Sequence, residues 1–229
     1  MITFNEIHKS FSCGASWEML FNPLEVEALA GINFEHPRGV TLLLTGPAGA
    51  GKSVLLNLIA GLYSPDRGQV RVNKQDPYRS LDIKKKMVLV RNGQDQFDRE
   101  LSARENLGLL GGWYGLGEDE CKQRVEEVLE FVGLEKEARS VALGELSAGT
   151  ASQVSLAGGL LPSPDFLLLD DPGRHLSSGA IEQINKLLEA LENRGMTLII
   201  ASKRPEICSG LDIRRLELKD GRQVNYDAV

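Results

Sequence analysis

Apolar and polar residues alternate near the start of the chain, which predicts β-strands. Ile2 and Phe4 begin this pattern, and residues 31–35 repeat it. The stretch between them, residues 12–27, is irregular, and we expect an ordinary loop there, with an extended hairpin tip or a contact element as the alternatives. The pattern as a whole favours an antiparallel β-subdomain at the N-terminus.

Short apolar runs without alternation recur further along the chain. They are residues 42–44, 87–90, 166–169 and 196–201. Runs of this length between turn residues predict buried strands. Residues 69–73 alternate again and predict a short strand. A last alternating segment begins at Leu216 and leads through an Asp-Gly turn to a final strand.

The middle of the chain has a helical pattern instead. Between residues 102 and 141, apolar residues recur at i, i+3, i+4 and i+7 among glutamates. These positions are Val125, Val128, Leu129 and Val132. Gly133 then stands where a helix would end. Residues 154–161 and the amphipathic segment 181–191 predict two further helices.

A glycine-rich loop follows the first apolar run. It reads G-x-x-x-x-G-K-S and consists of Gly46, Pro47, Ala48, Gly49, Ala50, Gly51, Lys52 and Ser53. A strand, a glycine loop and a helix are the context of a phosphate-binding loop, in which backbone N–H groups and the positive helix end face an anion. Lys52 would contact the β- and γ-phosphates, and the Ser53 hydroxyl would hold Mg²⁺. The motif predicts that the chain binds a nucleoside triphosphate.

Two carboxylates, Asp170 and Asp171, follow the apolar run at residues 166–169. Ligands gather at the carboxyl ends of parallel strands, so we expect this strand to lie beside the strand of the glycine loop. Asp170 would orient Mg²⁺, usually through water. Asp171 would face the γ-phosphate as a candidate base for the attacking water.

The composition narrows the class of protein. A net charge of −6 over 229 residues argues against a nucleic-acid partner, because nucleic-acid-binding surfaces are basic. Neither the cysteines nor the histidines have disulfide-framework or metal-ligand spacing, so we expect a reducing cytoplasm. These residues are Cys13, Cys121, Cys208, His8, His36 and His175. The N-terminus lacks a signal-peptide core, and no apolar run approaches the ~20 residues that cross a bilayer. We expect any membrane span to come from another chain.

These motifs, in this order, resemble those of ATP-binding cassette (ABC) ATPases, the nucleotide-binding subunits of ABC transporters. Residues 146–150, Leu-Ser-Ala-Gly-Thr, resemble the family signature L-S-G-G-Q, and residues 166–170 resemble the Walker B strand. Phe11 stands where the family places its adenine-stacking aromatic residue. Residues 104–107 and 113–116 resemble the helical subdomain of exporter-type members, especially those paired with ABC-2-type permeases. The resemblance covers nearly the whole chain.

The resemblance implies an α/β fold of the ABC ATPase type. Its parts would be a β-subdomain at 1–36, a RecA-like P-loop NTPase core at 37–96 and 157–229, and an inserted helical subdomain at 97–156. The family uses ATP and Mg²⁺ and works as a head-to-tail dimer. Ser147 and the Gly149 backbone would therefore contact the γ-phosphate bound by a second ABC ATPase subunit. The other implied partner is a membrane permease, which would hold this chain on the cytoplasmic face of the cell membrane.

Several residues differ from the family's motifs at positions that the family uses for ATP hydrolysis. Asp171 replaces the catalytic glutamate and is one methylene shorter, and Lys203 aligns with the switch histidine. Ser177 replaces the aspartate of the D-loop. The Q-loop glutamine corresponds to either Asn92 or Gln94. Two further changes are in the signature, at Ala148 and Thr150.

Together these departures predict a slow or degenerate ATPase subunit, in a homodimer or beside a competent partner. Asp171 acting as an adequate base, with Lys203 in a compensating role, is the second choice. The alternative function is a regulatory or structural module that binds ATP with little turnover and acts on a membrane partner.

Overall fold

The computed structural model of the chain describes residues 1–13, 24–91, 97–174 and 176–227. The first unit is an antiparallel sheet in the order β2-β1-β4. Its strands are β1 (Ile2–Cys13), β2 (Leu24–His36) and β4 (Arg67–Val72). The rings of Phe4 and Phe34 face each other across β1 and β2, stacked with centroids 4.8 Å apart.

The expectation of an ordinary loop over residues 12–27 was wrong at both described ends of that stretch. Ser12 pairs with Glu25, and β1 and β2 continue to Cys13 and Leu24. The two strands therefore form a long hairpin, because cross-strand hydrogen bonds outweigh the weak alternation there. Residues 14–23 lie outside the described residues.

The position of β4 also differs from expectation, because we had assigned this segment to the core. It pairs antiparallel with β1, with Ile2 opposite Val72 and Phe4 opposite Val70. Only these two valines of β4 are buried, so the strand has a single apolar face. A strand of that kind fits a sheet with one solvated face better than the doubly covered parallel core.

The second sheet is the core of the molecule and has the order β5-β6-β7-β3-β8-β9. Its strands are β3 (Thr41–Thr45), β5 (Met87–Arg91), β6 (Phe166–Asp170), β7 (Thr197–Ala201), β8 (Ile213–Lys219) and β9 (Arg222–Tyr226). All neighbours are parallel except β9, which runs antiparallel to β8.

The expected contact between β6 and β3 was wrong, because β7 lies between them. Every residue of β7 is buried, which makes it suited to a central position in the sheet. The carboxyl ends of β3, β7 and β6 nevertheless meet at one edge of the sheet.

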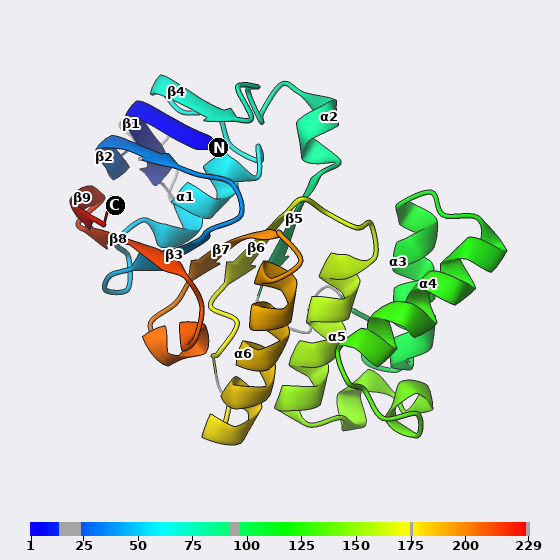
Figure 1. Ribbon diagram of the computed structural model, residues 1–229. Helices are drawn as coiled ribbons and strands as arrows, with labels where there is room; N and C mark the ends of the chain where they lie inside the picture. The colour runs from blue at the N-terminus through cyan, green and yellow to red at the C-terminus, as the bar shows by residue number, and fades with distance from the viewer. Residues whose placement is uncertain (14–23, 92–96, 175, 228–229) are drawn as a thin grey trace.

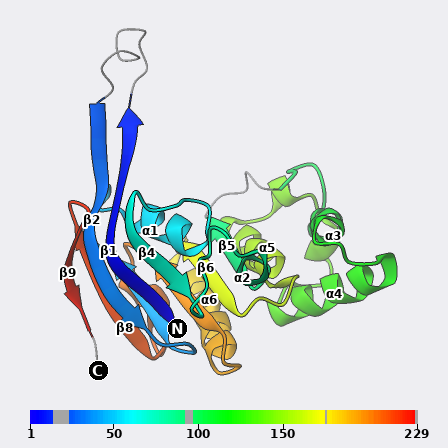
Figure 2. The same cartoon turned by 90° about the horizontal axis from the view of Figure 1, so that it is seen from above.

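Helices cover both faces of the core sheet (Figure 1). The α-helices are α1 (Lys52–Ile59), α2 (Leu81–Lys84), α3 (Ala103–Trp113), α4 (Glu118–Phe131), α5 (Ala148–Leu160) and α6 (Ser178–Glu192). Single turns of 3₁₀-helix occupy Ala138–Ser140, Leu143–Glu145 and Pro205–Cys208. Helix α1 lies between the two sheets, while α3 and α4 lie at the opposite end of the molecule (Figure 2).

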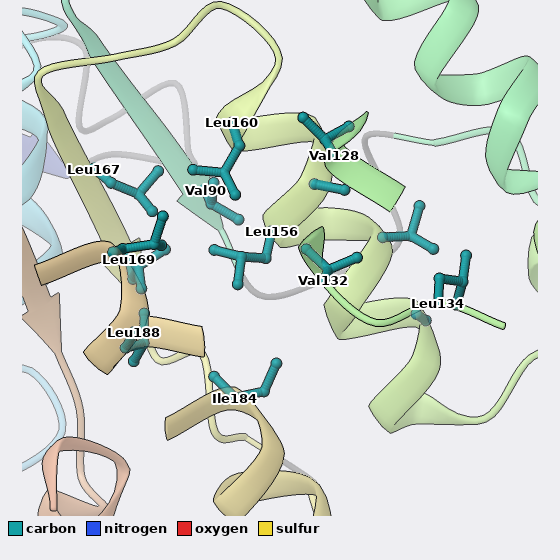
Figure 3. Packing of buried hydrophobic residues seen from close by; sticks show 14 of the residues in the cluster. Val90, Val128, Val132, Leu134, Leu156, Leu160, Leu167, Leu169, Ile184 and Leu188 are labelled. Carbon is teal, nitrogen blue, oxygen red and sulfur yellow. The ribbon is translucent and has the colours of Figure 1, made fainter. Parts of the chain in front are cut away.

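Alternate residues of the core strands enter two different hydrophobic clusters. In β6, Leu167 and Leu169 belong to the cluster with α5 and α6, while Phe166 and Leu168 belong to the cluster with α1. Figure 3 shows the first pair pointing toward α5 and α6. A strand buried on both faces needs an unbroken apolar run, which explains the pattern in the sequence.

Serine side chains cap four of the helices. Ser80, Ser102, Ser147 and Ser177 are the N-caps of α2, α3, α5 and α6, and each side chain accepts an N–H of the first turn. Gly133, with φ of 70°, follows the end of α4, as predicted. Helix α5 runs through the boundary that we placed at residue 157. No helix in the described part of the chain is both long enough and apolar enough to span a membrane.

Candidate active site

The glycine loop connects β3 to α1 through a conformation that side chains would not permit. Gly46 has φ of 135°, and a Cβ there would lie 2.1 Å from the Leu218 carbonyl oxygen. Gly51 has φ of 97°, and a Cβ would lie 2.7 Å from the Ala28 carbonyl oxygen. The chain therefore turns sharply between the backbone at Leu218 and the backbone at Ala28, and the N-terminus of α1 points toward the sheet edge.

Lys52 is the first residue of α1 and curls back over the loop. Its Nζ donates to the carbonyl oxygens of Gly46 and Pro47 at 2.7 and 2.8 Å. Burial lowers the pKa of Lys52, the nearby charge of Lys203 lowers it further, and Asp171 and Asp170 raise it. The ammonium group thus stands among the charged groups that the sequence singled out.

Ser53 and Asp170 meet across the sheet edge. The Ser53 Oγ donates to the Asp170 Oδ1 at 3.0 Å, although the two residues are 117 positions apart in sequence. A hydroxyl and a carboxylate oxygen side by side suit Mg²⁺, which prefers oxygen ligands and takes one or two carboxylates together with substrate phosphates. No group of three His, Cys, Asp or Glu among the described residues is placed to hold a metal ion.

A cavity of about 420 Å³ opens at this edge. It is lined by Ala28, Ala48, Gly49, Ala50, Gly51, Lys52, Ser53, Val54, Arg91, Asp170, Asp171, Arg174, Ala201 and Lys203. Four of these side chains are cationic and two are carboxylates, so the lining is positive in a chain whose net charge is −6. The local charge favours an anionic ligand.

Asp171 lines the cavity from a left-handed backbone conformation, with φ of 54°. Its N–H donates to the Ala201 carbonyl oxygen at 2.7 Å, which ties the end of β6 to the end of β7. Aspartate adopts this conformation more readily than longer residues do. Lys203, two residues beyond β7, is exposed at the same cavity.

Comparison with known proteins identifies the family. The model of the family described as ABC transporter matches residues 29–174, which is more than half of the chain. The chain belongs to the ABC transporter family. It is an ATP-binding subunit of that family and an ABC ATPase, as the sequence predicted.

Similar proteins cover most of this ABC ATPase. The Nod factor export ATP-binding protein I of Paraburkholderia xenovorans is 29% identical over 97% of this chain and 69% of its own. A putative ABC transporter ATP-binding protein of Methanosarcina mazei is 33% identical over 87% of this chain and 69% of its own. The chain therefore spans about two thirds of the length of these relatives.

A solved structure supports the fold. A dimeric post-hydrolysis state of the ATP-binding cassette MJ0796, bound to ADP and Pi, matches with a TM-score of 0.83. It is 24% identical, and the match covers 99% of this chain and 98% of that one. The predicted ABC ATPase fold is confirmed.

The structure brings together only part of the predicted site of this ABC ATPase. All residues from Ala48 to Ser53, and with them Asp170, Asp171 and Lys203, line the cavity, while Gly46 and Pro47 hold the Lys52 ammonium. Their roles toward a nucleotide remain predictions. Asn92 and Gln94, the two Q-loop candidates, lie outside the described residues.

Phe11, Ser147 and Gly149 are not among the described residues that line the cavity. The Phe11 ring stands edge-on to Tyr63 at 5.4 Å, with the Lys9 Nζ at 5.4 Å from its centroid. Ser147 and Gly149 are at the N-terminus of α5, where Ser147 caps the helix through Thr150. Adenine stacking by Phe11 stays a prediction.

Two arginines of the cavity were missed by the sequence analysis. Arg91 ends β5, and Arg174 follows β6 by four residues. The rule that located Asp170, a charged residue at the carboxyl end of a buried strand, would also have found Arg91.

Proposed function

We propose that this ABC ATPase binds ATP with Mg²⁺ between two cassettes and drives or gates a separate membrane permease, with slow hydrolysis. One observation carries the proposal. The Ser53 hydroxyl and the Asp170 carboxylate lie 3.0 Å apart at the mouth of the glycine loop, inside a positively lined cavity. A triphosphate with its metal ion is the ligand that this combination of groups suits.

Ser53 and Asp170 are the residues that would hold Mg²⁺. The ion, when bound, supplies positive charge against the β- and γ-phosphates. The backbone N–H groups of the loop and the N-terminus of α1 would bind the phosphate oxygens. Lys52 would exchange its two carbonyl acceptors for phosphate oxygens, a stronger interaction because both partners are charged.

Asp171 would orient the attacking water and accept its proton. Its carboxylate is one methylene short of the family's glutamate, and a misplacement of about 1 Å can cost about 100-fold in rate. Lys203 would stand near the γ-phosphate as a cation, but it cannot accept a hydrogen bond as an imidazole can. These two residues are the reason that we propose slow turnover.

A second cassette would complete the site. Ser147 and Gly149 lie outside the cavity of their own chain, so they would serve the nucleotide of a partner subunit. Support comes from α5, whose N-terminus begins at these residues and offers N–H groups to an anion. The partner would be a second copy or a competent relative.

A groove on the helical side is the proposed contact with the permease. It is lined by Val88, Leu89, Val90, Phe97, Leu110, Trp113, Tyr114, Gly158 and Gly159. Trp113 is 81% exposed and the neighbouring Leu109 is 55% exposed, an unusual concentration of apolar surface. Docking there would hold the chain at the cytoplasmic face of the membrane.

The alternative is a regulatory module that binds ATP with little turnover. Ser177 favours it, because this residue has no carboxylate at the D-loop aspartate position, and its hydroxyl is engaged in capping α6 through Ala180. The ATPase rate, measured with and without the membrane fraction that co-purifies, distinguishes the two. A motor is stimulated by its permease, whereas a regulatory module retains ATP without stimulation.

Nucleotide binding itself is tested by equilibrium dialysis with labelled ATP and Mg²⁺. Lys52→Ala should abolish binding. Lys186→Ala, which removes an exposed lysine of α6 paired with Glu182, is the matched control. The proposal fails if the wild-type chain shows no magnesium-dependent uptake, or if Lys52→Ala binds as tightly as Lys186→Ala.

A further inference from the structure

Arg91 occupies a position in the cavity that the proposed mechanism does not use. It is the last residue of β5, and the parallel register places it directly beside Asp170 of β6. Met87 and Leu89 of β5 pack in the cluster with α1, as do Phe166 and Leu168 of β6. Because side chains alternate along a strand, Arg91 and Asp170 continue these rows and stand on the same face.

Both side chains reach the same helix. Asp170 accepts from Ser53, and the Nη2 of Arg91 donates to the Asn57 Oδ1 at 2.7 Å. Ser53 and Asn57 are four residues apart and therefore adjacent on one face of α1. The contacts form two parallel links between neighbouring strands and consecutive turns of one helix, so the guanidinium is fixed next to the Ser53–Asp170 pair.

The anchor constrains how the guanidinium can bind a ligand. Asn57 is only 9% exposed, so the acceptor that holds Arg91 is nearly buried. One amino group of a planar fork is thereby fixed, while the same side chain lines the cavity. A guanidinium has five N–H donors in a rigid arrangement that suits phosphate oxygens.

We infer that Arg91 is a phosphate-binding residue that contacts the terminal phosphate of the bound nucleotide. The inference rests on the proposed function and adds a residue to it. Its position beside Asp170 places the charge at the metal end of the cavity, where a triphosphate carries the group that a diphosphate lacks. Arg91 therefore makes the site selective for ATP over ADP.

Affinities for ATP and ADP, each with Mg²⁺, test the inference through their ratio. Arg91→Met keeps most of the side-chain stem but removes all donors, and we expect a roughly 10- to 100-fold loss of ATP affinity with less than about 3-fold for ADP. Arg91→Lys keeps the charge but lacks the planar fork of donors, so its affinity for ATP should lie between those of the wild type and Arg91→Met. Arg79→Met, at an arginine whose side chain is 85% exposed, is the control for lost charge.

A role limited to bracing β5 against α1 predicts a different result. Asn57→Leu removes the brace and keeps the guanidinium, so it should retain much of the preference for ATP while lowering the melting temperature. Equal losses of ATP and ADP affinity in Arg91→Met, or the same ratio in Arg91→Met and Asn57→Leu, would overturn the inference. If the wild-type chain binds neither nucleotide, the proposed function itself fails; if it binds both and Arg91→Met keeps the wild-type ratio, only this inference fails.

Discussion

Substitution of Gly46 by alanine should damage the glycine loop through one identifiable clash. The new Cβ would lie 2.1 Å from the Leu218 carbonyl oxygen, whereas ordinary van der Waals contact begins near 3.4 Å. Leu218 is fully buried in β8 and pairs with Gln223 of β9, so it has little freedom to move. The loop must therefore shift by about 1 Å, and it carries the carbonyl that holds Lys52 with it.

The loss of stability caused by this clash can be separated from the loss caused by backbone strain with a matched variant. Gly39 also has a positive φ, 80°, but a Cβ there meets nothing within 4 Å. Gly39→Ala therefore includes the strain of a left-handed alanine, about 1–2 kcal/mol, without a clash. Overpacking adds about 1–3 kcal/mol, so Gly46→Ala should be less stable than Gly39→Ala by that amount.

Urea unfolding of both variants gives the comparison directly, and ATP binding gives a second readout. Gly46→Ala should lose about 100-fold or more in ATP affinity or turnover, because a displacement of about 1 Å moves the groups that bind and position the substrate. Gly39→Ala should bind ATP normally. The reasoning is refuted if the two variants have free energies of unfolding within about 0.5 kcal/mol of each other and bind ATP equally well.

Three further predictions follow from single residues. Asp171→Glu should raise the rate of phosphate release by up to about 100-fold, because it restores the reach of the family's carboxylate, while Asp171→Asn should nearly abolish it; an Asp171→Glu rate at or below wild type would contradict the assignment. Ser53→Ala should weaken ATP binding in Mg²⁺ but leave binding in EDTA unchanged, because only the proposed metal ligand is lost; equal losses in both buffers would refute the metal role. Burial lowers the pKa of His36 to about 4 from 6.5, since its ring is fully buried between the Tyr226 hydroxyl and the Val40 carbonyl oxygen. The unfolded chain then binds a proton at higher pH than the folded one, so the free energy of unfolding should fall by up to about 3 kcal/mol as the pH drops from 6.5 to 4. His36→Gln should remove most of that pH dependence in urea titrations, and an unchanged slope would show that His36 is not its source.

The elements of this fold were predictable from the sequence because each depends on local pattern. A helix, a buried strand and a glycine loop need residues that are neighbours in sequence, so periodicity and spacing identify them. The positions of Lys52, Asp170 and Asp171 at one sheet edge followed from the rule that ligands gather at the carboxyl ends of parallel strands. For the same reason, the resemblance to ABC ATPases rested on short motifs and was confirmed.

Which strand lies beside which was beyond the sequence alone. Two buried strands such as β3 and β6 have the same apolar pattern, and nothing local says that β7 separates them. Likewise, β4 belongs to the antiparallel sheet and not to the core, because only one of its faces is apolar and an edge of β1 is available to pair with it. Pairing is a competition among distant segments, and only the packed molecule decides it.

The sequence by itself determined that this protein has a phosphate-binding loop, a carboxylate pair and the order of motifs of an ABC ATPase. Only the tertiary structure decided that β7 separates β3 from β6 and that Arg91 is anchored on Asn57 beside the Ser53–Asp170 pair. The physical reason is that a side chain's chemistry is fixed by its identity, whereas its partners are fixed by sheet order and by helix packing. Those depend on burying apolar surface from the whole chain at once.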